Sequence, residues 1–330
     1  MSSDEVARLV CVGEALIDLV ATERGAALSE AATFVRAAGG APANVAVGAA
    51  RLGVRTAFLG KVGADPFGDH LVSTLAAAGV DTSMVTRDAQ ARTGLAFVSR
   101  APDGEREFLF YRSPSADQRL RTDEVDGGRV ARAEVLHFGS LGLAVSPARE
   151  ATLHAASVAG RAGALRSLDV NLRLDGWRSD GEARRAVLAA AAASEVVKVS
   201  EGELDFLAGG KDAAAVRTLI SGSTRLLVVT EGAAGAGYHL VTQDGLATGH
   251  VPGFAVDALD TTGAGDAFVA GLLTGMLLDR AALVDPAALE GVLRRANACG
   301  AIATTRLGAI PALPTAGELA AFLAAVSTSA

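Results

Sequence analysis

The segment Asp260-Thr-Thr-Gly-Ala-Gly-Asp266-Ala-Phe-Val-Ala-Gly-Leu-Leu273 joins a turn of small residues directly to an apolar stretch with helical spacing. Gly263, Ala264 and Gly265 let a ligand come close to the backbone, and the helix that follows would point its unpaired amides at that ligand. Such a helix start favours an anion. Asp266 adds a carboxylate, which predicts a site for moving a phosphoryl group onto a hydroxyl. The alternative is a plain strand-to-helix turn whose glycines only ease packing.

Short apolar runs alternate with helical stretches along the rest of the chain. Runs with the pattern of strands buried on both faces lie at 9–12, 135–139, 164–170, 195–199 and 226–230. Ala-rich helical stretches such as 147–159 and 181–193 separate them. This order predicts an α/β fold with a central, mostly parallel sheet flanked by helices on both faces. Because no linker or internal repeat interrupts the pattern, we expect residues 1–330 to form a single domain.

Polar side chains follow three of these runs. They are Asp169, Asn171 and Arg173 after one run, Ser200 and Glu203 after the next, and Thr230, Glu231 and Gly232 after the third. Ligands of such sheets gather beyond the carboxyl ends of the strands. The clustering therefore predicts one site at that edge of the sheet.

A second turn of small residues lies near the start of the chain. Gly39-Gly40-Ala41-Pro42 precedes a helix expected at 45–52 and exposes backbone amides. Asn44 suits either a helix cap or a ligand contact. Asp18 stands in an apolar setting, where an unpaired carboxylate is unfavourable. A sugar hydroxyl would serve as its partner, and a turn or a nearby Arg would serve equally well.

The pattern changes between residues 92 and 113. Leu95, Phe97, Phe108 and Phe110 alternate with other residues around the turn signal Ala101-Pro-Asp-Gly104, which predicts a β-hairpin. With residues 14–37, the hairpin would form a small sheet that acts as a lid and excludes water. The rival interpretation is a homodimer interface, and one sheet could serve both purposes.

Composition excludes several classes. A formal charge of −7 and a pI near 5.3 argue against nucleic-acid binding. The acidic start of the chain does not resemble a signal peptide, and no long apolar run indicates a membrane span. Cys11 and Cys299 are too few for a disulfide framework, so we expect a cytoplasmic protein. Neither a P-loop motif nor metal-ligand spacing of histidines occurs.

Two segments carry a family resemblance. Gly39-Gly-Ala-Pro-Ala-Asn-Val-Ala-Val-Gly-Ala-Ala-Arg-Leu-Gly53 and Asp260–Asp266 resemble the N-terminal and C-terminal signatures of the ribokinase-like (PfkB-type) carbohydrate kinases. Segments at 111–117, 169–177, 297–305 and 308–315 are similar to those of fructokinases. The resemblance implies a ribokinase-like fold and an ATP-dependent kinase that phosphorylates a primary hydroxyl of a ketohexose, with fructose first.

The resemblance also implies roles for individual residues. Asp266 would be the base, and the amides of Gly263, Ala264 and Gly265 would hold the transferring phosphoryl group. The sugar contacts would be Asp18, Gly39, Gly40 and Asn44, joined by Asn171. The nucleotide would lie near Thr230, Gly232, Gly235 and Asn297. Glu203 matches a glutamate that orients water around Mg²⁺, whereas Ser200 replaces the Asn of the same motif. The places of a K⁺ site are occupied by Asp260, Thr262, Ala303 and Gly308, although Ala312 lacks a hydroxyl that some members use.

Several alternatives stay open. Ala41-Pro42 replaces the Lys-Gly of ribokinases, which favours a ketohexose over ribose. Arg112 and Arg173 could bind a carboxylate bidentately, as a 2-keto-3-deoxygluconate kinase would require. Another sugar or nucleoside kinase, a non-catalytic sugar or nucleotide sensor and a dehydrogenase are the remaining hypotheses. Gly232-Ala-Ala-Gly235-Ala-Gly237 has the wrong spacing for a dinucleotide loop, which argues against the last of these.

Overall fold

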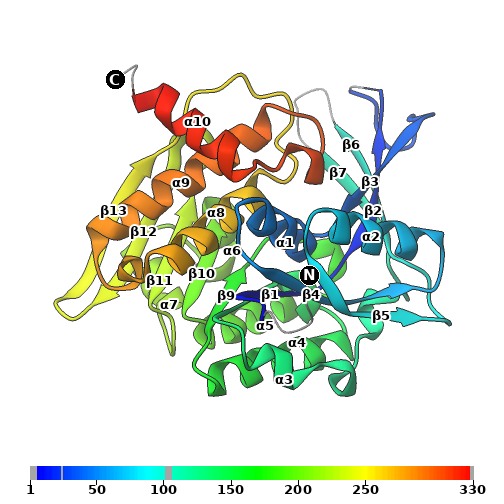
Figure 1. Ribbon diagram of the computed structural model, residues 1–330, viewed down its shortest axis with the longest axis horizontal. Helices are drawn as coiled ribbons and strands as arrows, with labels where there is room; N and C mark the ends of the chain where they lie inside the picture. Colours follow the sequence, from blue (N-terminus) through cyan, green and yellow to red (C-terminus); the bar gives the residue numbers. More distant parts are fainter. Residues whose placement is uncertain (1–5, 24, 101–105, 328–330) are drawn as a thin grey trace.

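A computed structural model describes residues 6–23, 25–100 and 106–327. Within these residues, nine strands form one sheet in the order β13-β12-β11-β10-β9-β8-β1-β4-β5 (Figure 1). From β11 to β5 all neighbouring strands are parallel, and β12 runs antiparallel to both of its neighbours. The bounds are β1 (Leu9–Val12), β4 (Thr56–Gly63), β5 (Asp81–Asp88), β8 (Val135–Gly139), β9 (Leu165–Asp169), β10 (Val196–Ser200), β11 (Leu226–Thr230), β12 (Gly235–Thr242) and β13 (Gly245–Pro252).

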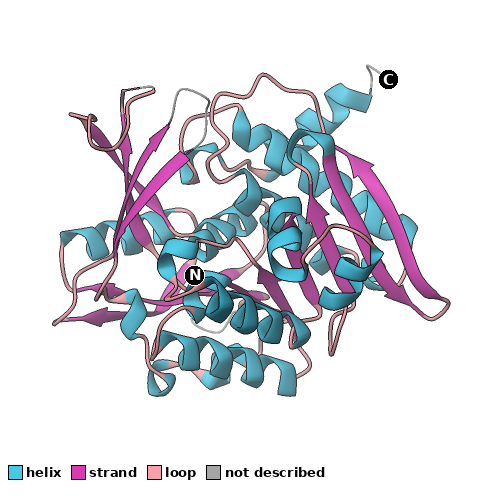
Figure 2. Cartoon of the chain, turned by 180° about the vertical axis from the view of Figure 1, so that it is seen from behind, coloured by secondary structure: helices cyan, strands magenta, loops and turns pink. Residues whose placement is uncertain are grey.

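A second, four-stranded sheet stands away from the main one, on its right in Figure 1 and on its left when seen from behind in Figure 2. Its order is β3-β2-β6-β7, from β2 (Leu16–Ala21), β3 (Phe34–Gly39), β6 (Leu95–Arg100) and β7 (Arg106–Tyr111). The β6–β7 hairpin is confirmed, although its expected turn at Ala101–Gly104 lies outside the described residues. The two segments expected to join therefore do form one sheet.

Helices cover both faces of the main sheet, each over its own apolar core (Figure 1). One face carries α1 (Ala41–Arg51), α2 (Pro66–Ala77), α8 (Ala264–Leu278), α9 (Pro286–Thr304) and α10 (Ala316–Ser327). The other carries α3 (Gly127–Val130), α4 (Ala148–Arg161), α5 (Asp180–Ala192), α6 (Glu201–Ala208) and α7 (Ala213–Leu219). The predicted fold class is thus confirmed.

Helix α8 is the central helix of its layer. Every residue from Asp266 to Leu277 is buried, because α8 packs between α1 and α9. Gly271 allows the approach to α9, since a Cβ there would lie 2.9 Å from the Cα of Ala296 and from Sγ of Cys299. Close packing on both sides fixes the start of α8, and with it the turn at 260–266.

The sequence pattern missed two parts of the sheet. Strand β5 was not expected, and neither was the antiparallel β12–β13 hairpin. The hairpin begins at Gly235, inside the Gly-rich segment, and its outer strand β13 is mostly exposed. An edge strand with one solvated face lacks the apolar run by which the buried parallel strands are recognised.

Candidate active site

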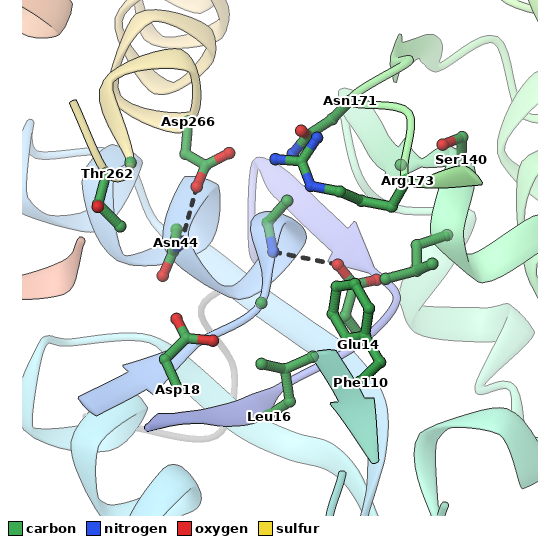
Figure 3. Close-up of a pocket in the computed structure, with 15 residues that line it drawn as sticks. Glu14, Leu16, Asp18, Asn44, Phe110, Ser140, Asn171, Arg173, Thr262 and Asp266 are labelled. Carbon is green, nitrogen blue, oxygen red and sulfur yellow. Dashed lines mark hydrogen bonds between the residues drawn. The ribbon is translucent and has the colours of Figure 1, made fainter. Parts of the chain in front are cut away.

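A cavity of about 90 Å³ opens where the ends of β1, β8 and β9 meet the second sheet and the start of α8 (Figure 3). Side chains from the main sheet and α8 face Leu16, Asp18 and Phe110 of the second sheet across it. Its full lining is Glu14, Leu16, Asp18, Gly40, Ala41, Asn44, Phe110, Gly139, Ser140, Leu141, Asn171, Arg173, Thr262, Gly263 and Asp266. The two turns of small residues, far apart in sequence, therefore border the same cavity.

Asn44 and Asp266 join these two turns directly. Nδ2 of Asn44 donates a hydrogen bond of 2.7 Å to Oδ2 of Asp266, and both residues are buried (Figure 3). Asn44 does not cap its helix, because α1 begins at Ala41 and Gly40 is the cap residue. Pro42 at the helix start explains the earlier beginning, since its fixed φ suits the first turn. The ligand-facing interpretation of Asn44 is the one that its position favours.

Gly263 shapes the turn before α8. It is the cap residue with φ of 76°, a left-handed conformation that favours glycine. As glycine it offers no side chain to cap α8, so amides of the first helical turn face the open end of the helix. The macrodipole of a fifteen-residue helix adds partial positive charge there. Of the three amides expected to bind an anion, that of Ala264 donates a hydrogen bond of 3.2 Å to the carbonyl oxygen of Thr261.

Asp18 lies on β2 with its carboxylate over the end of β3. A Cβ on Gly39 would lie 2.2 Å from Oδ2 of Asp18, so any other residue at position 39 would displace that carboxylate. Gly40 has φ of 105°, and a Cβ there would lie 2.4 Å from the carbonyl oxygen of Glu14. Gly39 and Gly40 thus let the backbone approach the carboxylate of Asp18 and the backbone of Glu14.

Three buried polar atoms around the cavity have no hydrogen-bond partner among the described residues. They are Oε2 of Glu14, Oδ1 of Asn44 and Oγ of Ser140, and all three side chains line the cavity. Oε1 of Glu14 does accept a hydrogen bond of 3.1 Å from the amide of Ala41 (Figure 3). Buried polar groups are normally paired. Unpaired ones that converge on a cavity indicate a ligand rich in hydrogen-bonding groups.

Glu14 also makes the stability of the protein depend on pH. Burial raises its pKa to about 7, although the charge of Arg112 acts in the opposite direction. A raised folded-state pKa stabilises the fold below the unfolded-state value near 4.5, and this stabilisation is lost as pH rises through about 7. Between pH 5 and pH 8 we therefore expect the wild type to lose roughly 2–3 kcal/mol more unfolding free energy than Glu14→Gln.

Urea unfolding of both proteins at the two pH values measures this difference. Glu30→Gln, which changes an exposed carboxylate, is the control and should follow the wild type. If the unfolding free energies of the wild type and Glu14→Gln changed equally between the two pH values, the raised pKa of Glu14 would be contradicted.

Asn171 and Arg173 enter the cavity on the loop after β9. Asn171 has φ of 33°, a positive value that Asn tolerates better than most residues. The loop is anchored by Glu203, whose Oε1 accepts a hydrogen bond of 2.7 Å from the amide of Leu172. Oε2 of Glu203 accepts another of 2.7 Å from the amide of Ser200, which completes a capping box on α6. Glu203 and Ser200 therefore hold the loop that presents Arg173.

Arg112 does not line this cavity. Its guanidinium donates hydrogen bonds from both Nε and Nη2 to Oδ2 of Asp117, and Ser115 donates one of 2.6 Å to Oδ1 of Asp117. Arg112 and Asp117 are both buried. The structure therefore gives Arg112 a partner within the protein, which weakens its expected role as a substrate contact.

Removing one member of this buried pair should destabilise the fold. For Asp117→Ala we expect a loss of about 3–5 kcal/mol of unfolding free energy, because Arg112 keeps its charge in a desolvated place. Asp123→Ala, which breaks the exposed pair with Arg121, should leave the urea midpoint unchanged. Equal midpoints for the two variants would show that the Arg112–Asp117 pair carries no such energy.

The residues expected near the nucleotide lie outside the sugar-sized cavity. Ser200 and Thr230 are paired across the ends of β10 and β11. Gly235 starts β12, and Nδ2 of Asn297 donates to the carbonyl oxygens of Val251 and Pro252 at 2.9 and 3.1 Å. A Cβ on Gly235 would lie 2.2 Å from that same Val251 oxygen. Gly235 and Asn297 thus meet at the end of β13, while Gly232, with φ of 60°, lies in the turn that leads to β12.

Asp260 ties together the residues expected to hold a monovalent cation. Its Oδ1 accepts hydrogen bonds from the amide and hydroxyl of Thr262 at 2.9 and 2.6 Å, and its Oδ2 accepts one from the amide of Gly308 at 2.9 Å. Its own amide donates to the carbonyl of Thr304, next to buried Ala303. Thr262 and Gly308 are therefore bonded to the Asp260 carboxylate, whereas Ala303 is connected to Asp260 only through its neighbour Thr304.

A wider cavity of about 540 Å³ adjoins the first and shares Asp18 and Thr262 with it. Strands β2 and β3, helix α2 and residues 307–311 line this second cavity, and most of the lining is apolar. Its lining includes carboxylates and hydroxyls, but among the described residues none of the buried polar atoms without a partner belongs to it. The chemistry thus favours the smaller cavity as the reaction site.

A buried ion pair lies beneath the start of α8. Nζ of Lys198 on β10 is 3.1 Å from Oδ1 of Asp169 on β9. Burial raises the pKa of Asp169 to about 6, with Lys198 acting in the opposite direction. Burial also acts to lower the pKa of Lys198, but the carboxylates of Asp169, Glu203 and Asp266 outweigh it and raise that pKa.

Sequence reasoning missed three residues of this region as site members: Glu14, Ser140 and Lys198. Glu14 and Ser140 each follow a buried strand, β1 and β8, so the rule applied to β9, β10 and β11 would have found them. Lys198 is one of the lysines, with Lys61 and Lys211, in a chain that otherwise uses arginine. A lysine inside a buried strand was the available signal.

Within the described ranges, no group of three or more His, Cys, Asp and Glu side chains could hold a metal ion. Over the same part of the chain, no helix has the length and apolar character needed to cross a membrane.

Comparisons with known proteins agree with this geometry. The model of the pfkB family carbohydrate kinases matches residues 6–316. A probable fructokinase-4 from Arabidopsis thaliana is 49% identical over 324 residues, which cover 98% of each chain. A fructokinase structure from Xylella fastidiosa with bound ATP superimposes with a TM-score of 0.88 at 37% identity, covering 98% of this chain and 100% of that one. A Vibrio cholerae O395 fructokinase bound to fructose, ADP and calcium ion gives 0.86 at 37% identity, covering 96% and 99%.

Proposed function

The chain belongs to the pfkB family of carbohydrate kinases, and from this premise we propose that it is an ATP-dependent fructokinase. It transfers the γ-phosphoryl group of ATP to a primary hydroxyl of fructose. The observation that carries the proposal is the convergence of unpaired buried groups from Glu14, Asn44 and Ser140 beside Asp266 and the anion turn. A polyhydroxylated ligand can satisfy several such groups at once.

The reaction follows from this arrangement. The hydroxyl oxygen of the sugar attacks the γ-phosphorus while its proton passes to the carboxylate of Asp266. A new oxygen–phosphorus bond forms, and the bond from the γ-phosphorus to the bridging oxygen breaks, so that its electron pair leaves on ADP. The amides of Gly263 and Gly265 and the start of α8 stabilise the charge on the transferring group, while the amide of Ala264 donates to the carbonyl oxygen of Thr261. Asn44 holds the Asp266 carboxylate in position.

Sugar recognition is divided between the two sheets. Asp18 and the Gly39–Gly40 backbone approach from the second sheet, whereas Asn171 and Arg173 approach from the end of β9. We propose that the whole chain is one domain and that the second sheet is its lid, with segments 14–37 and 92–113. Phe110 on the cavity side of that sheet supports the exclusion of water during transfer.

The proposed Mg²⁺ and K⁺ ions are supported by different observations. No cluster of carboxylates builds a dedicated Mg²⁺ cage among the described residues, which suits an ion that keeps its waters and binds mainly to phosphates. Glu203 would hold it through water, because each of its oxygens accepts one backbone hydrogen bond and retains a lone pair. When bound, Mg²⁺ offsets the phosphate charge. K⁺ would lie beside Asp260, with Thr262, Ala303 and Gly308 around it, and exchanging K⁺ for Na⁺ in the assay tests this.

The outer face of the lid supports a homodimer. Phe97 packs edge-on against Phe34 and Tyr111, with 5.3 Å between ring centroids in each pair. Tyr111 and Leu109 are 61% and 48% exposed, a solvent exposure that a partner subunit would remove. Phe110, also expected to take part, faces the cavity instead, and the side chain of Phe108 lies outside the described residues.

Dimerisation can be tested at this face. Leu109→Asp should give a monomer by light scattering at concentrations where the wild type is a dimer, because the charge would be desolvated at the interface. Leu246→Asp, at an exposed position of β13, is the control. A monomeric wild type would contradict the interface. We also propose a cytoplasmic location, supported by the two buried free cysteines, Cys11 and Cys299.

An ATP-to-ADP coupled assay with fructose, 2-keto-3-deoxygluconate, ribose and adenosine tests the function. We expect the highest kcat/KM for fructose. Arg173 in the cavity is the observation that would favour the keto acid, through a bidentate contact with its carboxylate. A higher kcat/KM for the keto acid than for fructose would identify the keto acid as the substrate. No turnover with any of the four compounds would contradict the proposal.

A further inference from the structure

The side chain of Lys198 places a positive charge next to the anion turn at residues 260–266. Its side chain is only 10% exposed and extends from β10 toward the first turn of α8. Nζ lies 3.6 Å from the position that a Cβ on Gly265 would take, and, apart from the chain neighbours of Gly265 and the backbone of its own helix, no other atom of the described residues lies within 4 Å of that position. The ammonium group is therefore next to the turn, at the level of its second glycine.

Gly265 leaves open space beside this ammonium. Gly265 is exposed, and its φ is not in the left-handed region, so its backbone does not require glycine. A Cβ there would make only ordinary contact with Lys198. The protein itself therefore has room for a side chain at this position, and the space beside Lys198 remains available to a ligand.

The space beside Gly265 lies outside the sugar cavity. Gly263 and Asp266 line that cavity, whereas Gly265 and Lys198 do not. Lys198 is close in the sheet to Ser200 and Thr230, whose paired positions mark the ends of β10 and β11. Lys198 thus approaches the turn from the side on which the phosphoryl donor would bind.

The carboxylates around the anion turn favour a cation beside it. Asp169, Glu203 and Asp266 all act electrostatically on Lys198, and their carboxylates would repel an arriving triphosphate. An ammonium held in a desolvated place acts more strongly on a nearby charge than one in water. Asp169 holds Lys198 in place, so the charge needs no rearrangement during the reaction.

We propose that Lys198 is a catalytic residue that contacts the γ-phosphoryl group of ATP and stabilises its charge during transfer. It forms no covalent bond and passes no proton. The proposal rests on the proposed function, because it assigns a further contact to the same reaction. Lys198→Met should lower kcat roughly 30-fold with the sugar KM within about twofold of the wild type. Lys198→Arg should recover part of that loss, since it restores the positive charge.

Neutralisation of Asp169 is the structural role that must be distinguished from catalysis. Asp169→Asn and the double variant Asp169→Asn/Lys198→Met provide this test, because neither contains an unpaired Asp169 carboxylate. If Lys198 acts on the phosphoryl group, the double variant stays at least tenfold slower than Asp169→Asn. If Lys198 only neutralises Asp169, the two variants turn over within about threefold of each other, which would overturn the proposal.

Nucleotide binding gives a readout that does not depend on the sugar. Calorimetry of the same pair with ADP and with AMP-PNP, an analogue that keeps a γ-phosphate, should show a loss at least fivefold larger for AMP-PNP in the double variant. Equal losses for both nucleotides would overturn the contact. A wild type that binds both nucleotides but phosphorylates no sugar would contradict the proposed function, while this comparison would still test Lys198.

Discussion

The Asp266→Asn variant is expected to turn over about 10³-fold more slowly than the wild type while binding the sugar almost as well. Asn has nearly the size of Asp and can still accept the hydrogen bond that Nδ2 of Asn44 donates at 2.7 Å. What it cannot do is take the proton of the attacking hydroxyl. The effect should therefore fall on kcat, with little change in the sugar dissociation constant.

Steady-state kinetics and calorimetry with the sugar measure the two quantities separately. Asp205→Asn, which changes an exposed carboxylate on α6, is the matched control and should keep wild-type kcat. If Asp266→Asn turns over within threefold of the wild type, Asp266 is not the proton acceptor.

Loss of Asp18 should act on sugar binding instead. We expect Asp18→Ala to raise the KM for the sugar roughly 10²-fold, because hydrogen bonds to a charged group are worth about 1.5–3 kcal/mol. The KM for ATP should change little, since Asp18 lies on the second sheet, across the cavity from Arg173 and the end of β9 (Figure 3). Measuring both KM values in one assay separates the two effects.

Gly39→Ala is a second test of the same contact. Its Cβ would fall 2.2 Å from Oδ2 of Asp18, so the carboxylate must move without losing its charge. The variant should raise the sugar KM in the same direction. If Asp18→Ala leaves the sugar KM within threefold of the wild type, Asp18 is not a sugar contact.

The buried half of the fold could be predicted from the sequence. Strands β1, β8, β10 and β11 are short, mostly apolar runs and β9 is a mixed one, and their alternation with helices specifies a parallel sheet with two covered faces. The turn at 260–266 could also be predicted, because its small residues and the following apolar helix are local features. In both regions the local sequence pattern and the overall fold favour the same structure.

The rest depends on contacts between distant residues. Asn44 and Asp266 are 222 positions apart, and nothing local shows that Asn44 donates to Asp266 instead of capping a helix. Arg112 has the charge expected of a carboxylate ligand, but Asp117 already holds it. Lys198 became interpretable only when the sheet placed it beside Asp169 and beneath Gly265.

We propose that this site moves a phosphoryl group from ATP to a primary hydroxyl of fructose. Phosphorus NMR of the product from the wild-type enzyme, fructose and ATP tests this transfer. We expect one new phosphomonoester signal, split by the protons of a CH₂ group, that grows in step with ADP. ADP without a sugar phosphate, or a phosphate attached to a secondary carbon, would contradict it.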